Sequence, residues 1–64
     1  MEKLTEREGF ILGLLINGHS NNEIAKMVYV SRHTVKTHVS AIIRKLDAQN
    51  RTNAVYIAAL KNIV

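Results

Sequence analysis

Helix start signals recur along this chain at short intervals, and they constrain its fold more than any other feature. Thr5-Glu6-Arg7-Glu8 and Ser20-Asn21-Asn22-Glu23 both have the form of a capping box, in which a Ser or Thr and a Glu three residues later each accept from the other's backbone N–H. Ser31 is a third candidate N-cap, directly before a long segment with apolar residues at helical spacing. Because the chain also has no proline, these signals predict an all-α fold.

The apolar spacing between these signals predicts four helices in a single domain that spans residues 1–64. The first helix has an apolar stripe at helical spacing, made of Phe10, Ile11, Leu14 and Leu15, and Gly18 stands where a left-handed C-cap is wanted. The predicted helices cover about residues 6–17, 21–28, 32–46 and 51–62. The second and third helices are joined by a very short link, so they cannot pack side by side in antiparallel orientation over much of their length. This arrangement is typical of a helix-turn-helix.

The composition excludes several classes of protein. With 64 residues and no cysteine, the chain has neither a disulfide framework nor cysteine ligands for zinc. His33 and His38 lie about 140° apart around a helix, so they do not readily share a metal ion. The sequence contains no recognisable nucleophile–base pair and no glycine-rich phosphate-binding loop. We therefore expect no enzyme activity, no cofactor and no metal. Since no apolar run approaches the roughly 20 residues that span a bilayer, we expect a cytoplasmic protein without a membrane partner.

The net charge of +4 is unevenly distributed along the chain. Residues 1–25 contain four glutamates and two cations, which is a net charge of −2. Residues 26–51 contain six cations against Asp47 alone, which is a net charge of +5. A local basic field of this kind indicates nucleic acid as the partner, although an ordinary solvated helix face is the alternative that charge alone leaves open.

The third predicted helix has two faces of different chemistry. At about 100° per residue, one sector holds the apolar residues Val35, Val39, Ile42, Ile43 and Leu46, and we expect this sector to face the core. The opposite side holds His33, Thr37, Ser40, Ala41 and Arg44, with Lys36 on its flank. There is no carboxylate from Arg32 to Leu46, whereas a merely solvated helix usually mixes the two signs of charge. Lys36 can donate to O6 and N7 of guanine, and Thr37 or Ser40 can form a hydrogen bond with a base edge. Ser31 and Thr34 can form hydrogen bonds with phosphate.

The chain resembles the LuxR/GerE (FixJ/NarL-type) helix-turn-helix domain over nearly its whole length. The matching residues are Leu4-Thr5-x-Arg7-Glu8, Ile11-Leu12, Gly18-x-Ser20-Asn21-x-Glu23-Ile24-Ala25, Val30-Ser31-x-x-Thr34-Val35-Lys36-x-His38, Lys45-Leu46 and Asn50-Arg51-x-x-Ala54-Val55. The resemblance implies a four-helix domain whose third helix enters the major groove and whose fourth helix is used for dimerisation in many members.

The resemblance also implies roles for individual residues. Lys36, Thr37 and Ser40 match positions that touch bases in the family, and His33 lies beside them, so we predict that these four residues read bases. The predicted phosphate contacts are Asn22, Ser31, Arg32, Thr34, Arg44 and Lys45; of these, Ser31, Thr34 and Lys45 match phosphate-side positions of the family. Asn22 stands where a lysine is common, and Ser40 stands where many members carry Lys or Arg.

The fourth predicted helix is apolar nearly all round, although only one face of it can turn inward in so small a domain. Val55, Ala58 and Ala54 can serve the core, which leaves apolar residues outside, and exposed apolar patches often mark an interface. We therefore predict a dimer interface made of Tyr56, Ile57, Leu60 and Lys61. A twofold dimer would space two recognition helices about one DNA turn apart.

These observations predict sequence-specific binding of duplex DNA for transcriptional regulation, by a homodimer. RNA polymerase is a candidate further partner, and family members commonly carry an N-terminal receiver or ligand-binding domain. Two alternatives stay open: a protein-interaction module that keeps the fold without DNA binding, and promoter recognition like that of region four of a sigma factor. The cations Lys36, Arg44 and Lys45 argue against the first alternative, and the Asn50-Arg51 turn argues against the second.

Overall fold

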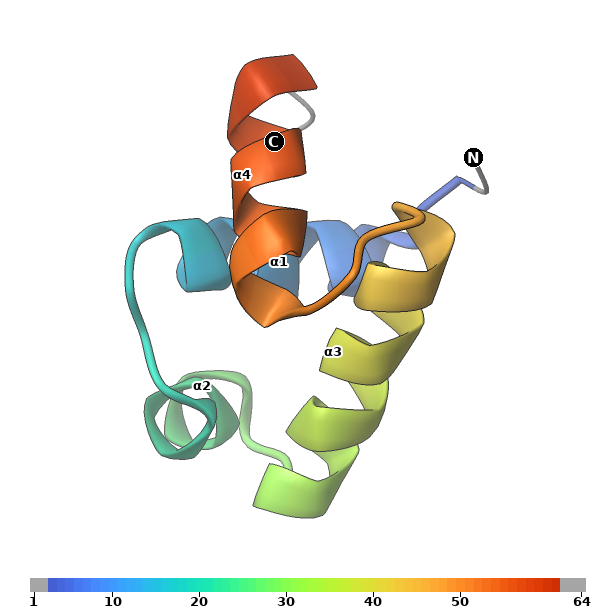
Figure 1. Ribbon diagram of the computed structural model, residues 1–64. Coiled ribbons are helices and arrows are strands. Elements are labelled where there is room, and N and C mark those ends of the chain that lie inside the picture. Colours follow the sequence, from blue (N-terminus) through green and yellow to red (C-terminus); the bar gives the residue numbers. More distant parts are fainter. Residues whose placement is uncertain (1–2, 62–64) are drawn as a thin grey trace.

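The computed structural model describes residues 3–61, which form four helices and no strands (Figure 1). The helices are α1 (Glu6–Ile16), α2 (Asn21–Val28), α3 (Arg32–Lys45) and α4 (Arg51–Lys61). The prediction of an all-α helix-turn-helix fold is confirmed, and each described helix ends within one residue of its predicted bound. Residue 62, the predicted end of the fourth helix, lies outside the described residues.

Each helix begins at a residue whose side chain accepts a hydrogen bond from the first turn. Glu8 N donates to Thr5 Oγ1 at 3.1 Å while Thr5 N donates to Glu8 Oε1 at 2.9 Å, so the first predicted capping box is complete. Ser20 and Glu23 form the second capping box with the same pair of bonds. Ser31 caps α3, and Asn50 Oδ1 accepts from Asn53 N at 2.8 Å at the start of α4. Local side-chain bonds therefore set where all four helices start.

Three connections contain a residue in the left-handed region of backbone conformation. Gly18 has φ 89°, as its place after α1 predicted. Tyr29, after α2, and Asp47, after α3, have φ 59° and 58°. An aromatic residue rarely adopts this conformation, since its Cβ crowds the backbone there. No motif of the sequence predicts the left-handed turn at Tyr29.

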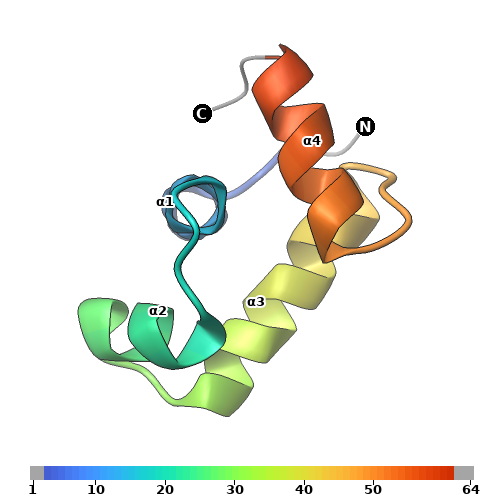
Figure 2. The same cartoon turned by 60° about the vertical axis from the view of Figure 1, so that its left-hand side comes forward.

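The core lies where α1 crosses α3 and α4, with α2 packed against the first half of α3. In Figure 2, α1 is seen nearly end-on, and α2 and the start of α3 lie below it. The largest fully buried side chains are Ile11, Leu12, Ile24, Val35 and Ile42. Ala54 and Ala58 supply the buried face of α4 and allow it to approach α1 closely. Among the described residues, no helix is long and apolar enough to cross a membrane.

The prediction that Phe10 belongs to the buried apolar stripe of the first helix is wrong. Its side chain is 58% exposed, whereas Leu12, which the stripe left out, is fully buried. The reason is that α1 packs against α3 and α4, so its buried face is centred on Ile11, Leu12 and Leu15. Phe10 lies to the other side, where it lines a shallow surface hollow with Met27.

Gly9 lies inside α1, where glycine is unfavourable because it loses the most backbone entropy on folding. A Cβ atom at this position would have no atom of a described neighbour within 4 Å. We expect Gly9→Ala to raise the free energy of unfolding by about 0.5–1 kcal/mol, measured by urea denaturation. Gly18→Ala is the matched control, and it should lower the same quantity because φ is 89° there. A loss of stability in Gly9→Ala would show that the site is closed to a methyl group.

Candidate nucleic-acid interface

The outward face of α3 carries all four predicted base-reading residues. His33, Lys36, Thr37 and Ser40 are exposed, while the opposite side of the helix is buried through Val35, Val39 and Ile42. Thr37 Oγ1 donates to the backbone oxygen of His33 at 3.1 Å. This bond restrains the Thr37 rotamer and uses the hydroxyl only as a donor, so its oxygen can still accept a hydrogen bond. The face can therefore offer donors from Lys36 and His33 next to small side chains that permit close approach.

The start of α3 carries hydroxyl groups that form a local network. Ser31 Oγ accepts from Thr34 N at 3.1 Å, and the two side-chain oxygens lie 3.0 Å apart. Ser31 is exposed and Thr34 is half-buried. Two further predicted phosphate contacts, Asn22 on α2 and Arg32 at the start of α3, are exposed, and Arg44 is exposed at the other end of α3.

A shallow hollow of about 700 Å³ lies where the starts of α2, α3 and α4 meet, and we call it the first hollow. It is lined by Ser20, Asn21, Asn22, Arg32, His33, Lys36 and Arg51. It brings together the predicted base-reading residues His33 and Lys36 with the predicted phosphate contacts Asn22 and Arg32. Arg51 is a member that the sequence analysis did not assign to the site.

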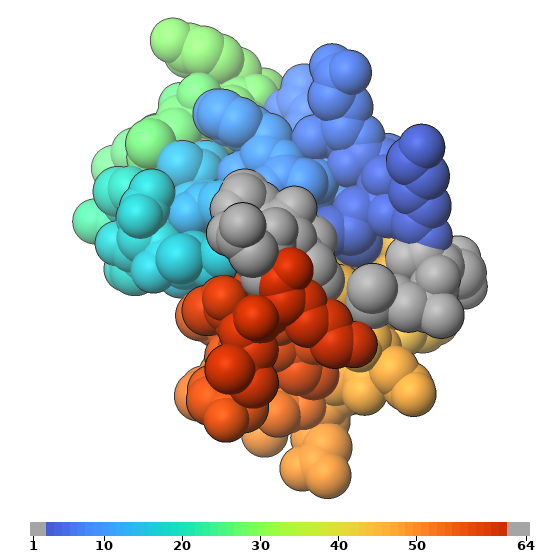
Figure 3. Space-filling model, turned by 90° about the horizontal axis from the view of Figure 1, so that it is seen from above, coloured from blue at the N-terminus to red at the C-terminus, as the bar shows by residue number. Residues whose placement is uncertain are grey.

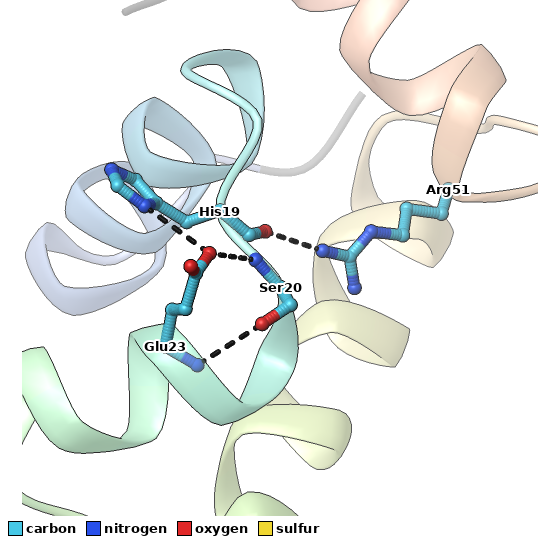
Figure 4. Close-up of polar contacts among 4 residues, drawn as sticks. All are labelled: His19, Ser20, Glu23 and Arg51. Atoms are coloured by element: carbon cyan, nitrogen blue, oxygen red, sulfur yellow. Dashed lines mark hydrogen bonds and ion pairs between the residues drawn. The ribbon is translucent and has the colours of Figure 1, made fainter.

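Arg51 ties the start of α4 to the start of α2. Its Nη2 donates to the backbone oxygen of His19 at 2.9 Å, and its Nη1 donates to the side-chain oxygen of Asn21. Figure 4 shows the guanidinium reaching from α4 to the connection between α1 and α2. The only sequence signal for this role was its place in the Asn50-Arg51 motif. These hydrogen bonds fix the start of α4 relative to the start of α2, and both helix starts line the first hollow.

The connection that Arg51 contacts is itself fixed by Glu23 (Figure 4). Glu23 Oε1 accepts from Ser20 N and lies 3.5 Å from His19 Nδ1. The hydrogen bond from the Ser20 backbone, followed by the contact with His19, lowers the pKa of the Glu23 carboxyl. The carboxylate is therefore ionised at neutral pH, and its charge is stabilised at the start of α2 by the helix dipole.

Lys45 forms a buried ion pair that the sequence analysis missed. Its Nζ lies 2.7 Å from Glu8 Oε1, and the two side chains are only 12% and 7% exposed. The hydrogen bond from Lys45, and then that from the Thr5 backbone, lowers the pKa of the Glu8 carboxyl. Glu8 and Lys45 are 37 positions apart, so no local pattern could pair them. The ion pair gives Lys45 a structural role, and the phosphate contact that the resemblance implies for it stays a prediction.

The outward face of α4 carries the predicted dimer residues. Tyr56 and Leu60 are 61% and 68% exposed, Lys61 is exposed, and Ile57 is half-buried. Seen from above in Figure 3, α4 stands at the surface of the molecule. The inner face of the helix is formed by Ala54 and Ala58, while Val55 packs at the edge of the core.

Three features together define a class of protein. The helices α2 and α3 cross at an angle and are joined by a short link, the exposed face of α3 has no carboxylate, and a basic hollow lies beside that face. This is the helix-turn-helix class of DNA-binding domain. The sequence model of the family described as "Bacterial regulatory proteins, luxR family" matches residues 2–58. The chain therefore belongs to the LuxR family, whose domain is a DNA-binding module of transcription regulators and not an enzyme.

Curated relatives support this assignment. The chain is 51% identical over 63 residues to the response regulator protein VraR of Staphylococcus aureus, and equally to that of Staphylococcus epidermidis. These alignments cover 98% of this chain and 30% of each relative. The chain thus spans about a third of the length of the curated relatives that it matches.

Solved structures have the same fold. Response regulator ChrA of a heme-sensing two-component system superimposes with a TM-score of 0.91 at 38% identity, over 100% of this chain and 32% of ChrA. Phage VqmA, solved as a complex with DPO, gives 0.89 at 31% identity, over 95% and 28% of the two chains. The transcription factor GerE gives 0.85 at 31% identity, over 97% of this chain and 92% of its own.

Proposed function

We propose that this chain binds duplex DNA in a sequence-specific manner, with α3 in the major groove. The observation that carries the proposal is the outward face of α3, where four polar or basic side chains are exposed and no carboxylate occurs from Arg32 to Lys45. His33, Lys36, Thr37 and Ser40 contact base edges in this proposal. Side chains at the starts of α2 and α3 and at the end of α3 hold the phosphate backbone: Asn22, Ser31, Arg32, Thr34 and Arg44.

The first hollow supports this orientation of the domain on DNA. It places the cations Arg32 and Arg51 next to Lys36, at the end of α3 that would enter the groove. A phosphate group in this hollow would also lie near the first backbone N–H groups of α2, which favour an anion. Lys45 stays a predicted phosphate contact, and its ammonium also pairs with Glu8.

The experiment that tests this proposal is fluorescence anisotropy of labelled random-sequence duplex DNA, titrated with the chain at several salt concentrations. We expect binding whose logarithmic affinity falls linearly with the logarithm of salt concentration, since each neutralised phosphate releases counterions. Absence of binding at low salt would contradict DNA recognition by this chain. The alternative hypothesis, that the basic face of α3 binds another protein, would then be favoured.

We also propose that the chain acts as a homodimer through α4. The support is the exposure of Tyr56 and Leu60 on one helix whose inner side is occupied by alanines. A patch of this kind, distinct from the face of α3, would allow two copies to present their α3 helices to successive turns of one DNA face. The chain spans about a third of its response-regulator relatives, which supports a longer chain with a receiver domain. We further propose RNA polymerase as a partner and a cytoplasmic location.

The dimer proposal predicts different outcomes for two exposed apolar residues. We expect Leu60→Glu to leave the monomer folded, because the side chain is 68% exposed, and to shift the chain to monomer in sedimentation experiments. Affinity for a two-half-site DNA should fall by about tenfold or more, since the two copies no longer bind as one unit. Phe10→Glu, at a residue 58% exposed on α1, is the matched control and should change neither the oligomeric state nor the DNA affinity. Unfolding of Leu60→Glu would instead assign Leu60 to the core.

A further inference from the structure

The C-cap of α2, in which Val30 N donates to Ala25 O at 3.1 Å, accounts for a left-handed backbone at Tyr29, but not for an aromatic residue there. Tyr29 ends α2 at φ 59° and ψ 44°, in the left-handed region where glycine is favoured. Its side chain is 93% exposed, so burial of the ring does not offset the unfavourable backbone. Residues held in such conformations often serve a function that their side chain supplies. The structure therefore raises the question of what the exposed phenol of Tyr29 contacts.

Tyr29 lines a second hollow, of about 580 Å³, which adjoins the first. Its lining residues are Asn22, Ala25, Lys26, Tyr29, Val30 and Arg32. Asn22 and Arg32 line both hollows, so they form a ridge between them. No carboxylate occurs among the described residues that line either hollow. The second hollow thus offers Lys26, Arg32 and the Tyr29 hydroxyl as hydrogen-bond donors, with no negatively charged side chain among its described lining residues.

We propose that the second hollow binds a phosphate group of the DNA backbone, with Lys26 and Tyr29 as its contacts. This inference rests on the proposed DNA binding of α3 and extends it to two residues outside the predicted site. If the first hollow holds one phosphate, the strand that continues past the ridge of Asn22 and Arg32 brings a neighbouring phosphate to Lys26. Lysine and tyrosine side chains are common donors to phosphate oxygens in protein–DNA interfaces.

The ligand is a phosphodiester of duplex DNA and not free phosphate. Both hollows are shallow, and Lys26, Tyr29, Arg32 and Asn22 are exposed, so water competes effectively for each donor. An isolated anion would gain little in such a site. A phosphate that is already positioned by neighbouring contacts of the same duplex loses less freedom on binding, which is why a tethered ligand binds where a free one does not.

Lys26→Gln provides the first test, with anisotropy of random and operator duplexes at several salt concentrations. We expect weaker binding to both duplexes and a slope of log affinity against log salt that is smaller by about 0.9, the value for one lost phosphate contact. Lys3→Gln removes an exposed lysine on the N-terminal segment, far from α2 (Figure 1), and should leave the slope unchanged. Inorganic phosphate at millimolar concentration should compete no better than expected from its ionic strength.

Tyr29→Gly provides a test that separates a contact from a structural role. We expect a higher thermal midpoint, because glycine suits the left-handed backbone, together with DNA affinity several-fold lower on all sequences. Tyr29→Phe should lose affinity without the gain in thermal midpoint. An unchanged salt slope in Lys26→Gln, or unchanged affinity in Tyr29→Gly, would overturn this inference while the unmodified chain still binds DNA. Failure of the unmodified chain to bind DNA would overturn the proposed function as well.

Discussion

Lys45→Met should lower the free energy of unfolding by about 3–5 kcal/mol, the range for removing one partner of a buried ion pair. The change leaves the Glu8 carboxylate buried without its cation, and the two side chains are only 7% and 12% exposed in the native pair. A domain of 64 residues has a total stability of about 3–10 kcal/mol. The variant should therefore be partly or largely unfolded at 25 °C. Urea denaturation at low temperature, followed by circular dichroism, measures the loss.

Two further variants identify the buried charge as the cause. Lys36→Met changes an exposed lysine of the same helix, and its stability should stay within about 0.5 kcal/mol of the unmodified chain. The double variant Glu8→Gln with Lys45→Met should recover part of the loss, because glutamine can still accept from Thr5 N and no charge remains buried. If Lys45→Met loses no more stability than Lys36→Met, then the ion pair is not what holds α1 to α3.

The Glu8–Lys45 ion pair can also be tested by measuring stability as a function of pH in the acid range. The pKa of Glu8 in the folded chain is lowered from its ordinary value of 4.5. Its charge therefore contributes stability that is present above pH 4.5 and is lost as the pH falls through the lowered native pKa. The slope of stability against pH in this acid range should be smaller in Lys45→Met, since the largest cause of the lowered pKa is gone.

Lys36→Ala should reduce affinity for the operator by about 1–3 kcal/mol, or roughly 5- to 150-fold, while it changes binding to random DNA far less. Lys36 is exposed on α3 and lines the first hollow beside His33 and Arg32. A lysine in the major groove loses its donation to guanine when it is truncated, and that loss is specific to sequence. In-vitro selection supplies the operator, and anisotropy competition against random duplex measures the ratio of the two affinities.

Arg32→Ala is the matched control for Lys36→Ala. Arg32 is an exposed cation at the start of the same helix, and we predict that it contacts phosphate. Its loss should weaken binding to operator and random DNA by the same factor and should reduce the salt dependence. If Lys36→Ala behaves in the same way, with equal losses on both duplexes, Lys36 is a phosphate contact and the base-reading role belongs to other residues of α3.

Local sequence determined the secondary structure of this protein almost completely. The capping residues Thr5, Ser20 and Ser31 accept from N–H groups three positions along the chain, so a short motif contains the whole interaction. The division of α3 into a buried and an exposed face follows in the same way, because the helical period is a local property. The exposed position of Lys36 and Thr37 could therefore be predicted from spacing alone.

Contacts between distant parts of the chain were decided only by the tertiary structure. The pairing of Glu8 with Lys45, the hydrogen bonds of Arg51 to the start of α2, and the exposure of Phe10 all depend on how α1, α3 and α4 cross. The same is true of the hollow that gathers Lys26, Tyr29 and Arg32. A local pattern states which face of a helix is apolar. Which neighbour each side chain meets depends on crossing geometry, which results from the packing of the whole core.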